Sequence, residues 1–140
     1  MRRAVSLAPR LQPVNKAMRK QYYFRQSDRG LLAWDVDRLV ELSAPLPRKR
    51  VPLADIRELN EDWSGDDEKR SWRAMLEHIR FINEADLSFP IILSANGAVM
   101  DGMHRVVKAT LAGYNDIEAV QFSEDPAPDY IGMGPDDLTY

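Results

Sequence analysis

The dipeptide Asn96-Gly97 restricts the fold of this chain more than any other feature, because it lies between two short apolar segments. Both central positions of a type I′ turn need a positive φ, and Asn-Gly is among the pairs that meet this need best. Proline is tolerated at the first position of a strand. The sequence therefore predicts a β-hairpin whose strands cover Pro90–Ser94 and Ala98–Asp101.

A helix and a last strand are expected directly after this hairpin. The helix should run from about Met103 to Ala112, and Gly113 fits the left-handed residue that ends many helices. The next apolar segment, Ile117–Phe122, is typical of a strand. Helical spacing assigns five residues to the buried face of the helix: Met103, Val106, Val107, Thr110 and Leu111.

The beginning of the chain predicts less regular structure. Gln21–Phe24 is short and aromatic, which fits either a strand or a docking segment, and Ser27–Gly30 has the composition of a turn. Asp35 is placed to cap a short helix that ends near Ser43. We assign Leu32 to the apolar face of that helix.

The middle of the chain completes the predicted fold. A strand over Val51–Leu53 should be followed by a single helical turn over Ala54–Leu59. The longest helix is expected over Asp67–Ala85, with a buried apolar stripe formed by Trp72, Met75, Leu76, Ile79 and Ile82. These elements predict a small α+β domain, in which a short mixed sheet has a β-hairpin that leads into a helix and is packed by two or three helices.

Charge divides the chain into three parts. Residues 1–29 hold eight Lys/Arg and one Asp, whereas residues 123–140 hold five acidic residues and no basic one. We therefore predict a basic N-terminal arm over 1–29, a single domain over 30–122 and an acidic, Pro- and Gly-rich extended tail over 123–140. A basic arm can contact nucleic acid. We favour the simpler interpretation, in which the arm pairs with an acidic face of its own or a partner chain.

Several classes of protein are excluded by composition. The chain has no cysteine, which excludes disulfides, cysteine-ligated zinc and thiol catalysis. No segment approaches the roughly 18 apolar residues of a membrane span, and the basic start Met1–Arg10 lacks the apolar core of a secretory signal. We expect a cytoplasmic protein without a membrane partner. His78 and His104 lie far apart without metal-ligand spacing, so no protein-bound metal is predicted.

The chemically useful side chains gather where the second hairpin strand enters the helix: Asp101, Gly102, His104, Arg105 and Lys108. A helix N-terminus already carries about half a positive charge. Basic side chains collected against this dipole are understandable if an anion binds there, facing the free N–H groups of the first turn. Gly102 would let the backbone approach the ligand, Arg105 would grip a phosphate at two points and Lys108 would add a point charge.

A purely structural interpretation of the same residues stays open. Asp101 would then cap the helix and pair with Arg105. His104 would be a hydrogen-bonded scaffold residue, and Lys108 would be solvated. Any phosphoryl transfer would need a base, for which Asp101 and the acidic segment Glu58–Asp62 are candidates.

The residues of this cluster resemble a known signature. The run Asp101-Gly102-Met103-His104-Arg105, set between Pro90-Ile91-Ile92-Leu93 and Ile117-Glu118-Ala119-Val120, is similar to the ParB/sulfiredoxin superfamily and its ParB-like nuclease domain group, over roughly residues 51–122. The resemblance implies a nucleotide-phosphate site at this turn. The matching segment binds CTP phosphates in ParB proteins and ATP phosphates in sulfiredoxins. Met103 stands at the position of the sulfiredoxin catalytic cysteine, so that chemistry is excluded.

Two functions from different classes follow, and a homodimer is compatible with either. In the first, the chain binds CTP, ATP, ADP or another phosphorylated small molecule between Asp101 and Lys108, with or without Mg²⁺. Such a site would also suit a phosphotransferase or hydrolase in which Asp101 and His104 are catalytic. In the second, the chain is a non-catalytic module that binds nucleic acid or protein through residues 1–29. A metal-dependent nuclease is a weaker third alternative.

Overall fold

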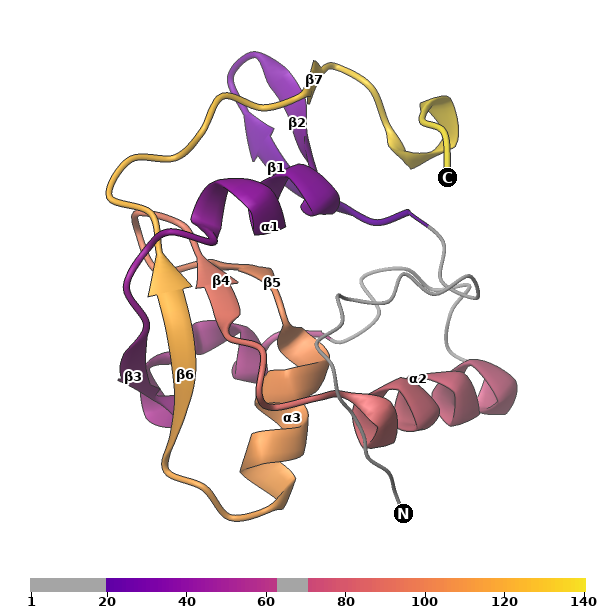
Figure 1. The fold of residues 1–140 in the computed structure, drawn as a ribbon. Helices are drawn as coiled ribbons and strands as arrows, with labels where there is room; N and C mark the ends of the chain where they lie inside the picture. Colours follow the sequence, from indigo (N-terminus) through magenta and orange to yellow (C-terminus); the bar gives the residue numbers. More distant parts are fainter. Residues whose placement is uncertain (1–19, 63–70) are drawn as a thin grey trace. The chain divides into compact units, whose positions relative to one another are not determined.

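The computed structural model describes residues 20–62 and 71–140 (Figure 1). Their contacts divide the chain into two compact units, one formed by Met1–Asp37 with Pro128–Tyr140 and the other by Arg38–Ala127. The described elements are helices and two small sheets, which confirms the α+β class. Most of the predicted arm, residues 1–19, lies outside the described residues, as do residues 63–70. The domain boundaries drawn from charge stay a prediction.

The first unit contains a three-stranded antiparallel sheet in the order β1-β2-β7. Strands β1 (Tyr22–Ser27) and β2 (Gly30–Asp35) form a hairpin over the predicted turn, where the Ser27 hydroxyl accepts the N–H of Arg29. Strand β7 (Tyr130–Ile131) pairs with β2. The sequence prediction was wrong at Leu32, which lies on β2 instead of a helix, because cross-strand pairing with β1, where Leu32 lies opposite Arg25, outcompetes helical spacing.

The segment after residue 122 is also more structured than the extended tail that was predicted. Besides β7 it contains the short 3₁₀ helix η4 (Pro135–Asp137). Backbone hydrogen bonds from the N–H groups of Asp129 and Gly132 to β2 hold it in place. Turn-rich composition does not prevent pairing with a strand whose edge is open.

Helix α1 (Val36–Ser43) begins at the end of the first unit and continues into the second. The side chain of Asp35 accepts a hydrogen bond from the N–H of Asp37 at 2.9 Å, which confirms the predicted cap. Lys20 lies next to the same helix start, with its ammonium 3.1 Å from Asp35 and 3.2 Å from Asp37. These carboxylates raise the pKa of Lys20 to about 12.

The second unit contains a four-stranded mixed sheet in the order β3-β6-β4-β5. Strands β4 (Ile91–Leu93) and β6 (Asp116–Gln121) are parallel, while the outer strands β3 (Lys49–Pro52) and β5 (Val99–Asp101) pair antiparallel to them. After β3 come two 3₁₀ helices, η1 (Leu53–Asp55) and η2 (Arg57–Asn60), in place of a single predicted turn. The buried side chain of Ile56 separates them.

The predicted hairpin between β4 and β5 is confirmed, but its turn is not type I′. The N–H of Gly97 donates to the carbonyl of Ser94 at 2.9 Å, so the turn is centred on Ala95 and Asn96. Gly97 follows with a φ of +92°, which is the arrangement of a three-residue loop. The side-chain oxygens of Ser94 and Asn96 both accept from the N–H of Ala98, and these bonds favour the longer loop.

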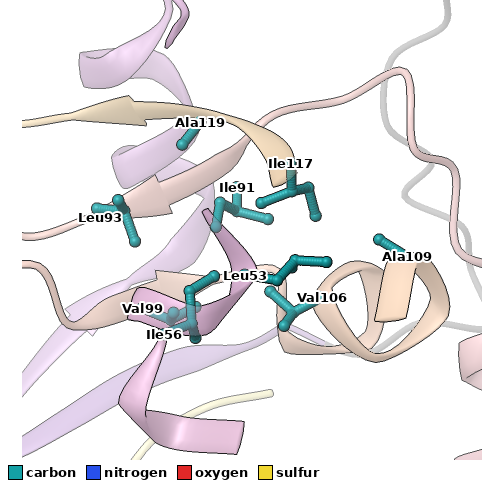
Figure 2. Packing of buried hydrophobic residues seen from close by; sticks show 9 residues of the cluster. All are labelled: Leu53, Ile56, Ile91, Leu93, Val99, Val106, Ala109, Ile117 and Ala119. Carbon is teal, nitrogen blue, oxygen red and sulfur yellow. The ribbon is translucent and has the colours of Figure 1, made fainter. Parts of the chain in front are cut away.

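Helix α3 (Met103–Leu111) packs on the sheet of the second unit through Val106 and Ala109, whose side chains are fully buried. Figure 2 shows Val106 pointing into the same space as Ile91 and Leu53. The predicted buried face of α3 was partly wrong, since Leu111 is 75% exposed. Leu111 follows the buried Ala109 by two residues, which places it roughly 200° around the helix and therefore away from the sheet.

Helix α2 (Trp72–Glu84) is capped by Ser71, whose hydroxyl accepts the N–H of Ala74 at 3.0 Å. The predicted buried stripe was wrong for most of its members, because Ile82 is buried whereas Trp72 is 87% and Leu76 60% exposed. The physical reason is that α2 faces α3 with His78 and Phe81, whose rings lie against His104. No helix in residues 20–62 and 71–140 is long and apolar enough to cross a membrane.

Candidate functional site

The predicted site lies where β5 ends and α3 begins. Gly102 is the residue directly before the helix and has a φ of +115°. Residues other than glycine rarely adopt this backbone conformation. A Cβ atom at this position would lie 2.6 Å from Cγ2 of Ile91 and 3.0 Å from Nη2 of Arg105. The glycine is therefore required for packing within the fold, in addition to any approach of a ligand.

The first turn of α3 has no side-chain cap. Asp101 was a candidate for this cap, but the N-cap residue is Gly102, which has no side chain that could accept a hydrogen bond. The carbonyl of Gly102 accepts the N–H of Val106. Among the described residues, no group accepts from the N–H groups of Met103 or His104, so the positive end of the helix keeps free donors.

Arg105 lies across this helix start and is held by oxygen atoms on two sides. Its Nη2 atom is 3.1 Å from Oδ2 of Asp101 and 3.3 Å from the carbonyl oxygen of Pro90. The two charged side chains are only 16% and 21% exposed. The Nε–H group of Arg105 is buried and has no acceptor among the described residues. The predicted pair is thus present, and one buried donor of the guanidinium has no acceptor among the described residues.

His104 faces α2 instead of the helix start. Its Nε2 atom lies 3.3 Å from Nδ1 of His78, and its ring centroid is 5.6 Å from that of Phe81. Burial, together with the nearby His78 and Arg105, lowers the pKa of His104 to about 4, and burial also lowers the pKa of His78. His104 is therefore uncharged at neutral pH and does not add a cation to the predicted anion site.

The structure brings together the two histidines that are 26 residues apart in the sequence. A signal for this contact was present, since His78 lies at the edge of the apolar side of α2 and His104 lies one turn before Lys108. Sequence spacing alone does not show which two helices face each other. The predicted catalytic role of His104 stays a prediction.

Lys108 binds the C-terminal end of α2. Its ammonium donates to the carbonyl oxygens of Asn83 at 2.9 Å and Ala85 at 2.7 Å. A helix C-terminus carries the negative end of the macrodipole, so the cation is favourably placed there. The ammonium of Lys108 is thus directed at the end of α2 and not at the start of α3, so its bonds do not support the predicted phosphate contact.

Glu58, which the sequence left open as a candidate, contacts the strand that leads into the site. Its Oε2 atom accepts the N–H of Val99 at 2.9 Å, on the outer strand β5. Val99 precedes Asp101 by two residues, so both residues lie on the same face of the strand. The second carboxylate oxygen, Oε1 of Glu58, is buried and has no hydrogen-bond partner among the described residues. Glu61 and Asp62 are exposed.

Other features of the described residues do not add to this site. They contain no group of three or more His, Cys, Asp and Glu side chains that could hold a metal ion. An open pocket of about 280 Å³ lies between the hairpin turn and β3, where Gly97, Arg50 and Gln121 are among its lining residues. None of the residues predicted for the anion site lines this pocket.

Comparison with known proteins adds no assignment. No family model matches the chain, and no curated protein or solved structure does either. The resemblance to the ParB/sulfiredoxin superfamily thus stays a prediction from the residues that carry it.

Proposed function

We propose that the chain binds the phosphate group of a nucleotide, or of another phosphorylated small molecule, at the start of α3. The observation that carries the proposal is the uncapped helix start, at which no described residue accepts from the N–H groups of Met103 and His104. Free N–H groups and the positive end of the helix dipole together attract anions. Arg105 lies beside these donors and supplies a positive side chain.

The charges around this helix start favour a nucleotide that carries Mg²⁺. His104 is neutral and Lys108 is bound to α2, which leaves the pair of Asp101 and Arg105 with no net charge. A bare phosphate would be repelled by the carboxylate of Asp101. A magnesium ion bound to the phosphates would be attracted by the same carboxylate, since Mg²⁺ prefers one or two carboxylates plus phosphate oxygens. CTP, ATP and ADP with Mg²⁺ are therefore the first ligands to test.

Two further arguments support the proposal without identifying a reaction. The ParB/sulfiredoxin resemblance assigns phosphate binding to Gly102 and Arg105, the residues that lie at the uncapped helix start. Glu58 brings a second carboxylate to β5, where it accepts the N–H of Val99, two residues before Asp101. Either carboxylate could serve as a base if a phosphoryl group is transferred. His104 contributes its backbone N–H to the phosphate contact that we propose, whereas its imidazole, which faces α2, has no part in it.

The alternative function, an interaction module that uses residues 1–29, receives no specific support. Lys20, which belongs to this arm, forms ion pairs with Asp35 and Asp37 of the same unit. This observation agrees with the interpretation in which the arm pairs with acidic residues of its own chain. Binding of nucleic acid by the arm stays a prediction.

The proposal is tested by thermal unfolding with CTP, ATP, ADP, GTP and inorganic phosphate, each with and without Mg²⁺. A ligand at about 100 times its Kd stabilises the folded state by roughly 2.7 kcal/mol, which shifts the melting temperature measurably. We expect a shift with a magnesium nucleotide that is lost in Arg105→Gln and kept in the control Arg48→Gln. Arg48 is an exposed arginine of the same unit, paired with Glu118.

Calorimetric titration of the same variants would separate lost affinity from lost stability, because Arg105→Gln also leaves Asp101 without its partner. A chain that shows no shift with any of these ligands, or an Arg105→Gln variant that binds as tightly as the original chain, would overturn the proposal.

A further inference from the structure

Helix α2 presents an apolar stripe that the described residues leave uncovered. Trp72, Leu76 and Ile79 follow one another at helical spacing and are 87%, 60% and 44% exposed. Contiguous exposed apolar side chains of this size are uncommon on a monomer and mark interaction sites. Figure 1 shows the C-terminal end of α2 beside α3, while its N-terminal end points away from the sheet of the same unit. We call these three side chains the α2 stripe.

A row of charges runs along one side of the α2 stripe. Its members are spaced at four, three and four residues, are all exposed, and alternate in sign: Arg73, Glu77, Arg80 and Glu84. Within the helix, Arg80 and Glu77 form an ion pair of 3.0 Å. From the N-terminal end of the helix the signs are plus, minus, plus, minus. From the C-terminal end they are minus, plus, minus, plus.

Because of this reversal, a second copy of α2 in antiparallel orientation is complementary in charge to the first. When a second α2 lies antiparallel to the first, Arg73 of one copy faces Glu84 of the other, and Glu77 faces Arg80. All four charges of each row then meet the opposite sign. In the same register the two stripes face each other, and Leu76 of one copy is offset along the helix axis by about two residues, or ~3 Å, from Ile79 of the second copy. In a parallel two-fold pair the two charge rows would lie on opposite sides of the dimer, so these ion pairs would not form.

We infer that two copies of this chain associate through the α2 stripe, with their α2 helices antiparallel about a two-fold axis. Such an interface is isologous, because the same patch is used by both copies. The apolar side chains supply the affinity, and the exposed ion pairs, which are individually weak, fix the orientation. One helix face per copy is smaller than the roughly 800 Å² per partner of a stable interface, so we expect a dimer that dissociates on dilution.

The first test is sedimentation equilibrium of the full chain over a wide range of protein concentration. We expect a monomer–dimer equilibrium. Leu76→Glu places a charge within the stripe and should weaken association by about 30-fold or more, as at other interface hot spots. The control Leu111→Glu changes an exposed leucine of α3, outside the stripe, and should leave the equilibrium unchanged.

The second test addresses the charge row. The double variant Arg73→Glu/Arg80→Glu makes the row entirely negative, and Glu77→Arg/Glu84→Arg makes it entirely positive. Each double variant alone should be monomeric, and an equimolar mixture should associate again. Because α2 is exposed at all these positions, the variants should keep the fold, which circular dichroism would verify.

Cross-linking determines the orientation, since the chain contains no cysteine of its own. An antiparallel pair predicts that a short bismaleimide joins a mixture of Arg73→Cys and Glu84→Cys chains but neither chain to itself. A chain that stays monomeric at every concentration, a Leu76→Glu variant that associates like the original, or efficient cross-linking of Arg73→Cys chains to each other would overturn the inference.

Discussion

Helix α3 has a glycine with a positive φ at each end, but the two glycines have different roles. Each end has a glycine with a positive φ, +115° at Gly102 and +86° at Gly113. At the C-terminal end, the N–H groups of Gly113 and Tyr114 donate to the carbonyls of Thr110 and Ala109, which satisfies the last turn. At the N-terminal end, the first-turn N–H groups keep free donors among the described residues.

The surroundings of the two glycines differ as well. A Cβ atom at Gly113 would meet nothing within 4 Å, whereas one at Gly102 would lie 2.6 Å from Ile91. Gly113 is therefore needed for its backbone conformation alone. Gly102 is needed for its conformation and for the close approach of the helix start to β4. A positive φ by itself thus does not reveal whether a glycine ends a helix or makes room at its beginning.

The largest expected effect tests this difference directly. Gly102→Ala should destabilise the fold by about 2–5 kcal/mol, since left-handed strain of roughly 1–2 kcal/mol adds to an overpacking cost of about 1–3 kcal/mol. Gly113→Ala should cost only the strain, about 1–2 kcal/mol. Urea unfolding followed by circular dichroism measures both values. Equal losses in the two variants would contradict the comparison.

The fold was more predictable from sequence than the site, for a physical reason. The hairpin, the helix that follows it and Gly113 depend on local propensities, and all three are present in the structure. The direction of a long side chain depends on which helix lies opposite. Lys108 illustrates this, because nothing near it in sequence indicates that its ammonium binds the end of α2.

The same limit explains the errors in burial. Helical spacing correctly finds an apolar side of α2 but does not state whether the chain covers it, so Trp72 and Leu76 were expected inside. Strand β2 was missed because its extended conformation depends on pairing with β1 on one side and the distant β7 on the other. Contacts across about a hundred residues leave no periodic signal in a single segment.

An intermediate effect is expected from the histidines beside the start of α3. The pKa of His104 is about 4 in the folded chain and 6.5 as its ordinary value, and the pKa of His78 is lowered too. Between these pH values the unfolded chain binds more protons, so stability rises with pH and falls on acidification from 6.5 toward 4. For one proton the slope reaches at most about 1.4 kcal/mol per pH unit.

Unfolding free energies at a series of pH values, compared between the original chain and His104→Gln, measure this slope. We expect the variant to show a flatter profile between pH 4 and 6.5, the range set by the two pKa values. The carboxylates contribute equally to both chains, so the difference isolates the histidine. An unchanged profile in His104→Gln would mean that the imidazole is not shielded as the structure indicates.

The smallest effect concerns Lys108, which lies in the last turn of α3 but stabilises the end of another helix. Lys108→Met should keep the aliphatic packing and remove the charge from the carbonyls of Asn83 and Ala85. We expect a loss of about 0.5–1 kcal/mol in urea unfolding. Lys49→Met, which changes an exposed lysine on β3, serves as the control. If both variants lose equally little, the contact with α2 is not energetically important.

Strand β7 has a consequence for the order in which this protein takes shape during synthesis. The hairpin of β1 and β2 leaves the ribosome early, but its third strand, Tyr130–Ile131, follows almost a hundred residues later. A lone two-stranded hairpin is marginally stable in water. The sheet of the first unit is therefore complete only after β7 has been synthesised, whereas the second unit has all its strands by Gln121. Folding of the nascent chain should accordingly begin with the unit Arg38–Ala127 and finish when Tyr130–Ile131 pairs with β2.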